Sequence, residues 1–175
     1  KLIVDKKKAY DSIVVVVSAM GKTTNSLIEM AQSISKLPDK REMDVLLSTG
    51  EQISISLLSM ALNEISEKSI SLTGWQAGIQ TYGSNTKQRI KDIDLSRINS
   101  ELAKHNIVIV AGFQGYDDEE NISTLGRGGS DTTALALAAA LDCPCEIYTD
   151  VDGIYTIDPR IHPAAQVIPH ISYEE

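Results

Sequence analysis

The chain has 175 residues, 42% of them hydrophobic, and a formal net charge of -8 with a pI near 4.9. That length can bury a core without disulfides, and the acidic balance argues against a nucleic-acid-binding surface. No continuous apolar stretch approaches the roughly twenty residues needed to cross a bilayer, and no charged-then-apolar leader opens the chain. We therefore expect a single cytoplasmic α/β domain over residues 1–175, with neither nucleic acid nor a membrane as a partner.

The first half of the chain predicts a buried strand followed by helices. Residues 12–18 (SIVVVVS) are a near-continuous β-branched run, which is typical of a strand covered on both faces. Helical spacing of apolar residues follows in three ranges: 25–35, 41–47 and 52–65. Pro38-Asp39 separates the first two ranges, and residues 48–51 (STGE) are expected to interrupt the helix between the second and the third.

The second half continues the alternation of strands and helices. Strands are predicted over residues 70–72, 107–111 (IVIVA) and 146–149, and helices over residues 95–104 and 132–141. The polar residues 83–86 (GSNT) and the acidic residues 117–120 are expected to be loops. This order of elements favours a sheet covered by helices over a helical bundle.

Glycine, hydroxyl groups and charges gather in the loops at the predicted strand ends, where ligands of open parallel sheets bind. Four loops have this character: 18–25, 112–115, 126–131 and 149–153. The third, Gly126-Arg127-Gly128-Gly129-Ser130-Asp131, is the most informative. Bare glycine amides at the start of a helix bind anions, and a guanidinium group grips a carboxylate or a phosphate. A glycine turn that only caps a core helix is the alternative interpretation.

The common nucleotide-binding and zinc-binding motifs do not occur in this sequence. Gly21-Lys22-Thr23 resembles the end of a Walker A loop, but position 16, where that loop needs its first glycine, is Val16. No G-x-G-x-x-G follows a predicted strand and opens a helix. Cys143 and Cys145 lack the second ligand pair of a zinc site, so we expect both to be reduced and partly buried.

Five segments resemble, in order, the motifs of bacterial aspartate kinases. They are 17–24 (VSAMGKTT), 48–52 (STGEQ), 112–115 (GFQG), 124–131 (TLGRGGSD) and 149–160 (TDVDGIYTIDPR). The last is shared across the amino acid kinase superfamily, whereas the glycine-rich block together with STGE is narrower and points to aspartate. The resemblance covers nearly the whole chain and implies a three-layer αβα sandwich with a mainly parallel central sheet.

The resemblance implies that the γ-phosphoryl group of MgATP moves to the side-chain carboxylate of L-aspartate, which gives an acyl phosphate. With an ordinary pKa of about 3.9, that carboxylate is already ionised, so catalysis depends on positioning and charge neutralisation rather than on a general base. The implied catalytic residues are Asp131, which orients a phosphate-binding lysine, and Arg127, which grips a substrate carboxylate. The implied aspartate-binding residues are Thr24, Asn25, Ser26, Glu51, Phe113, Arg127, Gly128, Gly129 and Ser130. Among them, Glu51 pairs with the α-ammonium group and Phe113 forms an apolar wall.

The positions that bind ATP also follow from the resemblance. They are Ser18, Thr149, Asp150, Tyr155, Asp158 and Arg160. The Mg²⁺ ion is expected to arrive on the nucleotide and not at a metal site of the protein. Without the resemblance, Asp152-Gly153 is an ordinary turn signal and Asp158-Pro159 an ordinary loop breaker. The expected partners are L-aspartate, ATP and a second copy of the chain in a homodimer.

Two parts of the family pattern are missing from this sequence. The family opens with a Lys-Phe-Gly-Gly-Thr-Ser loop, whereas the chain begins at Lys1 in what resembles the following helix, and it stops at Glu175 before the regulatory domains. We therefore expect the isolated chain to be inactive, because it lacks the lysine that neutralises the phosphoryl group. Two alternatives stay open: a sister kinase acting on glutamate, acetylglutamate, carbamate or a nucleoside monophosphate, and a non-catalytic assembly or regulatory module of the same fold.

Overall fold

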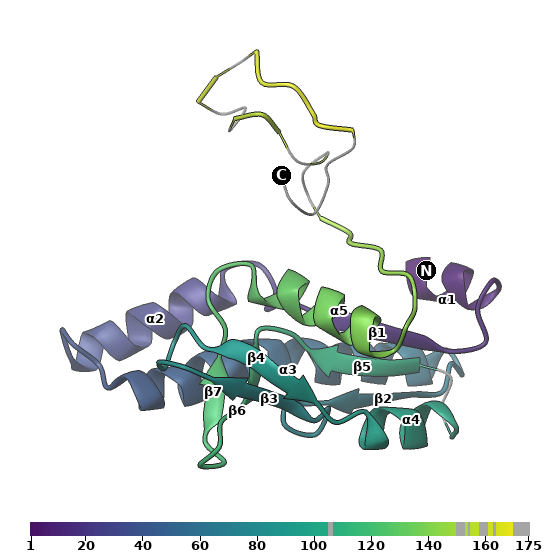
Figure 1. Ribbon diagram of the computed structural model, residues 1–175, viewed down its shortest axis with the longest axis horizontal. Coiled ribbons are helices and arrows are strands. Elements are labelled where there is room, and N and C mark those ends of the chain that lie inside the picture. Colours follow the sequence, from purple (N-terminus) through teal and green to yellow (C-terminus); the bar gives the residue numbers. More distant parts are fainter. Residues whose placement is uncertain (105–106, 150–152, 154, 158–160, 163, 170–175) are drawn as a thin grey trace. The chain divides into compact units, whose positions relative to one another are not determined.

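The computed structural model describes residues 1–104, 107–149, 153, 155–157, 161–162 and 164–169. The chain divides into two compact units, Lys1–Cys145 and Glu146–Glu175. All the helices and strands of the described residues belong to the larger unit (Figure 1).

A three-stranded parallel sheet forms the centre of the larger unit. Its strands are β1 (Ile13–Val17), β5 (Ile107–Ala111) and β2 (Ser69–Leu72), in the order β1-β5-β2. Val15 on one side and Ser71 on the other both pair with Ile109. All five residues of β5 have 0% exposure, so β5 is the buried middle strand that the IVIVA run predicts. The predicted strands at 12–18, 70–72 and 107–111 are confirmed.

A second sheet contains four short strands. They are β3 (Ile79–Tyr82), β4 (Arg89–Ile93), β6 (Gln114–Tyr116) and β7 (Ile122–Thr124), in the order β4-β3-β6-β7. The pairs β3-β4 and β6-β7 are antiparallel, and β3-β6 is parallel. The sequence pattern does not predict these strands, because they are short and, in β4, carry charged residues such as Lys91 and Asp92. The predicted loops at 83–86 and 117–120 lie in the two hairpin connections.

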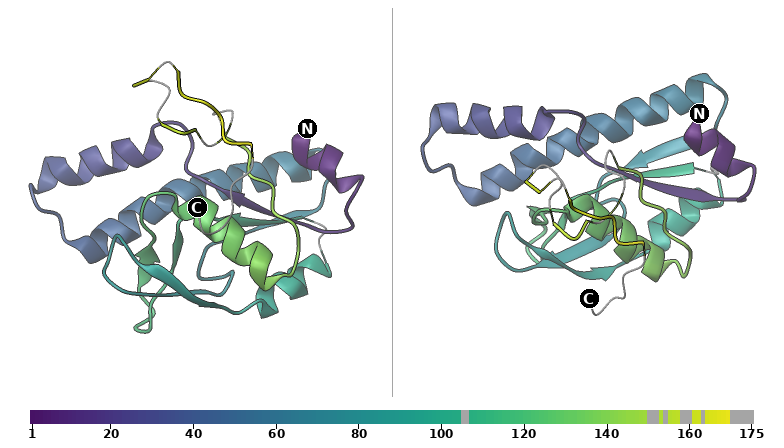
Figure 2. Two further views of the ribbon diagram at one scale, coloured as in Figure 1. Left: turned by 45° about the horizontal axis from the view of Figure 1, so that its top comes forward. Right: turned by 90° about the horizontal axis from the view of Figure 1, so that it is seen from above.

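Helices cover both faces of the parallel sheet, which produces the predicted three layers (Figures 1 and 2). The described helices are α1 (Leu2–Lys7), α2 (Thr23–Ile34), α3 (Lys40–Glu64), α4 (Ser96–Leu102) and α5 (Gly129–Ala140). Alternate side chains of β5 point to opposite faces of the sheet. Ile107 and Ile109 pack with α1 and α3 on one face, whereas Val108 and Val110 pack with α4 and α5 on the other.

Helix α3 is unbroken, so the predicted interruption at residues 48–51 is wrong. The hydroxyl groups of Ser48 and Thr49 donate to backbone carbonyl oxygens one turn earlier, at 2.8 and 2.7 Å, and these bonds lie within the helix. Gly50 is needed for a close contact, because a Cβ at that position would lie 3.0 Å from the Cβ of Ala19. Gly50 therefore allows α3 to pack closely on Ala19, and the two hydroxyl groups bond within the helix. None of the three residues forms a turn.

Helix α3 is also long and apolar enough, by length and composition alone, to cross a membrane. Its apolar character has another explanation, because its C-terminal half packs on the parallel sheet and its N-terminal half lies against β7. Two of its buried residues are the carboxylic acids Asp44 and Glu51. Helix α2 runs beside it on the outside (Figure 2). These contacts are those of a core helix.

Residues 146–149 form no strand, so that prediction is wrong. A strand needs a hydrogen-bonded neighbour, and none of the described strands pairs with these residues. Cys143 and Cys145 are free but exposed, and not partly buried as expected, because they lie in the irregular segment after α5. In the second unit, Tyr155 and Val167 form an isolated antiparallel bridge.

The substitution Ile109→Ala tests the central position of β5. It removes a fully buried side chain from the face covered by α3, so we expect a loss of about 2–5 kcal/mol in the free energy of unfolding. Ile34→Ala at the end of α2, where Ile34 is 89% exposed, is the control and should change stability by less than about 0.5 kcal/mol. Urea unfolding of the two variants measures both values, and equal losses would contradict the assignment.

Candidate active site

Helix α5 begins at Gly129, three residues earlier than the sequence predicts. Gly128 is its N-cap residue and has a left-handed backbone with a φ of 73°, which glycine adopts at little cost. The amide of Thr132 donates to the Gly128 carbonyl oxygen at 2.9 Å, so the amides of Gly129, Ser130 and Asp131 precede the first intrahelical bond. The predicted anion-binding residues therefore form the positive end of a 12-residue helix.

The glycine-rich turn packs directly on the loop after strand β5. A Cβ at Gly129 would lie 2.7 Å from the Cδ2 of Phe113, and one at Gly112 would lie 2.8 Å from the Cβ of Ser130. Phe113 has a positive φ of 67°, and its amide donates to Thr133 Oγ1 at 3.1 Å. A left-handed conformation of a bulky residue persists only where the surroundings hold it. The two loops therefore form one tightly packed unit.

Glu51 is a buried carboxylate with one oxygen left unpartnered. Its side chain projects from α3 toward the loop after β1, where Oε1 accepts a hydrogen bond from the amide of Ala19 at 3.0 Å. Oε2 is buried and has no hydrogen-bond partner among the described residues, and the residue is only 4% exposed. Burial raises the pKa of Glu51, although the Ala19 amide acts in the opposite direction. Such a carboxylate is suited to receive a cationic group.

The loops after β1 and β5 leave the same edge of the sheet, because the two strands are parallel neighbours. The amide of Gly112 donates to the carbonyl oxygen of Val17 at 3.0 Å and so joins the two strand ends. Helix α2 follows the first loop and packs on α3, with Leu27 3.6 Å from the position that a Cβ of Gly50 would occupy. The sheet edge therefore gathers the start of α2, the α3 carboxylate and the start of α5.

The structure places most of the predicted site residues at this edge. Ser18 follows β1 and is exposed, and in the first turn of α2 Thr24 is half-buried while Asn25 and Ser26 are exposed. The remaining residues of the predicted aspartate site lie on α3, on the loop after β5 and on the start of α5. The loop and α5 are joined by the contacts of Phe113 and Gly129.

The predicted nucleotide-binding residues beyond Ser18 are not in the larger unit. Thr149 and Tyr155 belong to the second unit, where Thr149 is exposed and Tyr155 is half-buried. The other predicted positions, Asp150, Asp158 and Arg160, lie outside the described residues.

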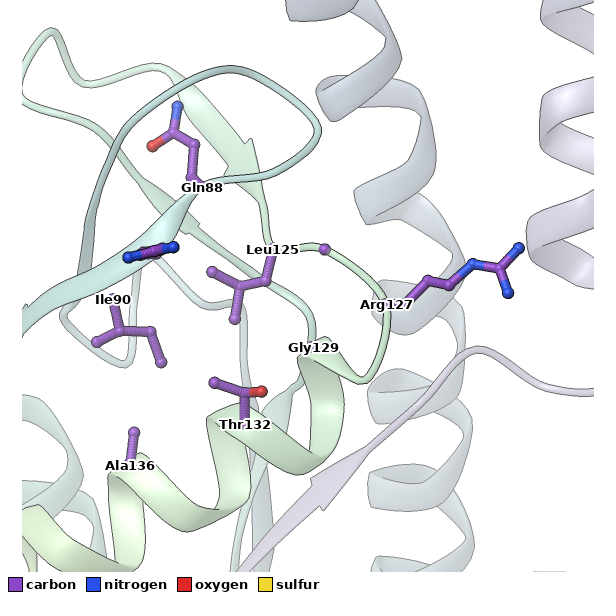
Figure 3. A pocket seen from close by; sticks show the side chains of 9 residues that line it. Gln88, Ile90, Leu125, Arg127, Gly129, Thr132 and Ala136 are labelled. Carbon is purple, nitrogen blue, oxygen red and sulfur yellow. The ribbon is translucent and has the colours of Figure 1, made fainter. Parts of the chain in front are cut away.

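Arg127 extends away from a pocket that lies between β4 and α5 (Figure 3). The pocket has a volume of about 360 Å³ and is lined by Gln88, Arg89, Ile90, Leu125, Gly126, Arg127, Gly129, Thr132 and Ala136. Neither Glu51 nor Phe113 lines it. The pocket therefore shares Arg127 and Gly129 with the predicted aspartate site, but the guanidinium group of Arg127 is exposed and points away from the pocket.

Sequence reasoning missed several buried polar residues next to the site. Asp44 has 0% exposure and accepts hydrogen bonds from the Thr86 amide and the Thr124 hydroxyl group. Gln114 donates from Nε2 to the Ser48 carbonyl oxygen at 2.8 Å. A signal was present, because residues 44, 48 and 51 recur at the spacing of one helix face. It was obscured by the predicted interruption of that helix.

The fold is α/β, and the loops after its parallel strands bring together a buried carboxylate and the glycine-rich start of a helix. Residues 1–175 match the model of the amino acid kinase family. The chain therefore belongs to the amino acid kinase family. Isopentenyl phosphate kinase, at 21% identity and a TM-score of 0.69 over 95% of this chain and 67% of that one, shares the fold.

Similar proteins at more than 50% identity include several aspartokinases. The chain is 56% identical to aspartokinase 2 of Bacillus subtilis (strain 168), with all of this chain and 43% of that protein aligned. It is 55% identical to an aspartokinase of Bacillus sp. (strain MGA3), with 99% of this chain and 42% of that protein aligned. These relatives confirm the resemblance that the five motifs carry. The chain spans about two fifths of the length of the curated relatives that it matches.

Solved structures give the same picture. The aspartate kinase from Synechocystis superposes with a TM-score of 0.75 at 53% identity, over 94% of this chain and 27% of that one. E. coli aspartokinase III in complex with aspartate and ADP superposes with a TM-score of 0.68 at 31% identity, over 82% of this chain and 33% of that one.

The substitution Glu51→Gln tests whether the buried carboxylate serves a ligand at the expense of stability. Because burial raises the pKa of Glu51 above its ordinary 4.5, the folded state binds more protons than the unfolded state above that pH. The carboxylate therefore destabilises the ligand-free protein increasingly as pH rises through the raised pKa. We expect the glutamine variant to be more stable than the parent by roughly 1–3 kcal/mol at about pH 8, and by much less near pH 4. Unfolding measured at both pH values checks this, and a glutamine variant that is less stable at pH 8 would contradict it.

The pair Gly129→Ala and Gly126→Ala tests the packing of the glycine-rich turn. A Cβ at Gly129 overlaps Phe113 and the Cβ of Leu125, at 2.7 and 2.9 Å, so we expect a loss of about 1–3 kcal/mol. A Cβ at Gly126 meets nothing within 4 Å, and that control should be nearly neutral. Helix propensity alone predicts the opposite sign for Gly129→Ala. Thermal unfolding of the two variants therefore separates packing from propensity.

Proposed function

We propose that the complete protein is an aspartate kinase. It transfers the γ-phosphoryl group of MgATP to the side-chain carboxylate of L-aspartate and forms 4-phospho-L-aspartate, at the start of lysine, threonine and methionine biosynthesis. The observation that carries the proposal is Glu51, whose buried Oε2 has no partner among the described residues and which lies at the sheet edge where α5 also begins. Relatives at 55–56% identity that are named aspartokinase support it.

An amino acid presents a cation and two carboxylates, and the proposed site has a group for each. Glu51 accepts hydrogen bonds from the α-ammonium group, which neutralises a charge that is otherwise buried alone. Arg127 grips one carboxylate through two parallel N–H donors. The amides of Gly128, Gly129 and Ser130 surround the anion, and the half-buried ring of Phe113 limits the space for a longer side chain. The half-buried Thr24 and the exposed Asn25 and Ser26, in the first turn of α2, complete the proposed aspartate site.

Phosphoryl transfer to this acceptor needs no proton abstraction, because the aspartate carboxylate is ionised at neutral pH. The barrier arises from the approach of two anions, and positive groups and precise placement lower it. In the proposal, Arg127 and the α5 amides hold the acceptor in place, and Asp131, exposed in the first turn of α5, orients the lysine that neutralises the phosphoryl group. In the aspartate kinase family, that lysine belongs to the opening Lys-Phe-Gly-Gly-Thr-Ser loop.

The family motifs assign to ATP one residue of the larger unit, Ser18, and five residues of the motif at 149–160. The exposed hydroxyl group of Ser18 follows β1 at the sheet edge and is assigned to the phosphates. Thr149, Asp150, Tyr155, Asp158 and Arg160 are assigned to the remainder of ATP on the strength of the family motif at 149–160. The Mg²⁺ ion is carried by the phosphates of the nucleotide.

We also place the complete protein in the cytoplasm as a homodimer. Helix α3 supports the proposal of a homodimer. Its residues Ile53, Leu57 and Met60 form an apolar row on the surface and are 47%, 47% and 59% exposed. Such rows are common at contacts between subunits.

The proposed activity is tested on the complete protein by trapping the acyl phosphate with hydroxylamine. MgATP is offered with aspartate, glutamate, acetylglutamate or carbamate as acceptors, and with a nucleoside monophosphate the release of ADP is followed instead, because its product is not an acyl phosphate. We expect hydroxamate from aspartate alone, and loss of the product in Asp131→Ala. Product from another acceptor would move the protein to a sister kinase, and no product from any acceptor would favour a non-catalytic module of this fold.

Arg127→Lys tests the contact with the carboxylate. Lysine keeps the charge but cannot donate two parallel hydrogen bonds, so the KM for aspartate should rise by about 10- to 100-fold. Arg89→Lys is the matched control, because Arg89 lies on β4, is exposed like Arg127 and is not among the predicted site residues. A control that raises the KM equally would remove Arg127 from the proposed site.

A further inference from the structure

One face of α3 carries three buried residues that make polar contacts with the rest of the unit. Asp44, Ser48 and Glu51 are spaced by four and three residues and are 0%, 0% and 4% exposed. Each contacts a different segment: Asp44 contacts the second sheet, the Ser48 carbonyl oxygen contacts Gln114, and Glu51 contacts the loop after β1. The same helix face therefore bears Glu51 of the proposed site and, two turns earlier, Asp44.

Asp44 binds two separate parts of the second sheet. Its Oδ1 and Oδ2 accept hydrogen bonds from the amide of Thr86, at 2.9 and 3.2 Å, in the connection between β3 and β4. Its Oδ1 also accepts a short hydrogen bond from the hydroxyl group of Thr124, the last residue of β7. One carboxylate thus ties α3 to a hairpin turn and to a strand end.

Thr124 is where the second sheet leads into the glycine-rich turn. Its carbonyl oxygen accepts from the amide of Gln88 at 3.0 Å, and the amide of the next residue, Leu125, donates to the Phe113 carbonyl oxygen at 2.8 Å. Arg127 follows three residues after Thr124. The Thr124 hydroxyl group is therefore the side-chain link between α3 and the segment that carries Arg127.

The hydrogen bond between Asp44 and Thr124 fixes the positions of its two segments and contributes little to the stability of the fold. Asp44 is completely buried, and desolvation raises the pKa of its carboxyl group while the hydrogen bonds from Thr124 and Thr86 oppose that rise. A buried charge held by neutral donors contributes little net stability compared with an apolar side chain of the same size. Its directional bonds, however, allow only one separation between the helix and the strand end.

From this geometry we infer that Asp44 is a positioning residue for the aspartate site. Through Thr124 it holds the turn that carries Arg127 at a fixed distance from Glu51. Glu51 and Arg127 can then contact the ammonium group and a carboxylate of one aspartate molecule at the same time. The inference rests on the proposed function, because it assigns Glu51 and Arg127 to the two ends of aspartate. Asp44 itself touches neither substrate nor the reacting atoms.

The test uses Thr124→Val in the complete protein, which removes the hydroxyl group and keeps the shape of a strand residue. We expect the KM for aspartate to rise about ten-fold, with the KM for ATP and kcat within about two-fold. Thr124→Ser restores the hydroxyl group and should restore the aspartate KM. Thr81→Val is the matched control, because Thr81 is equally buried in the same sheet but bonds to Gln88 and Ser123 instead of Asp44.

The outcomes separate the inference from the proposed function. If Thr124→Val lowers the melting temperature no more than Thr81→Val but alone raises the aspartate KM, the positioning role stands. If the two variants leave the aspartate KM equally unchanged in an active enzyme, Asp44 is only structural and the inference is wrong. If the parent protein forms no hydroxamate from aspartate, the proposed function fails first, whatever the variants do.

Discussion

Helix α3 buries two carboxylic acids, and the larger unit is arranged around that constraint. A carboxylate removed from water needs hydrogen-bond donors, because its desolvation costs several kcal/mol, about the gain from burying one or two apolar side chains. Asp44 obtains donors from Thr86 and Thr124 of the second sheet, and Glu51 obtains one from Ala19 after β1. The apolar C-terminal half of the helix packs on β5, so one element links both sheets.

The carboxylates of Asp44 and Glu51 differ in how many of their oxygens accept a hydrogen bond. Asp44 has donors on both oxygens and belongs to the framework, whereas Glu51 leaves Oε2 without a partner among the described residues. Desolvation raises the pKa of both groups, and we propose that a ligand offsets this cost at Glu51. A binding group held in this way is ready before the ligand arrives, and in the proposed site the ammonium group of aspartate supplies the missing neutralisation.

The loops at the sheet edge depend on close backbone contacts. Gly112 lies against Ser130, and Gly129 lies against the ring of Phe113, at distances that no side chain allows. These contacts join the loop after β5 to the start of α5, and the parallel pairing of β1 with β5 brings the loop after β1 to the same edge. A site built from three such loops needs little reorganisation on binding, which suits a reaction that depends on placement.

Local pattern in the sequence determined the strands β1 and β5, helix α2, and the glycine-rich start of α5, because β-branched runs, apolar spacing and glycine act within a few residues. The family motifs also located Glu51, Phe113 and Gly129. Only the tertiary structure decided that α3 is continuous, since the hydroxyl groups of Ser48 and Thr49 bond within the helix. The second sheet and the bond between Asp44 and Thr124 join residues up to 80 positions apart, and no local pattern records a partner at that distance. Pairing of this kind depends on which segments the fold brings together, so it becomes visible only when the chain is folded.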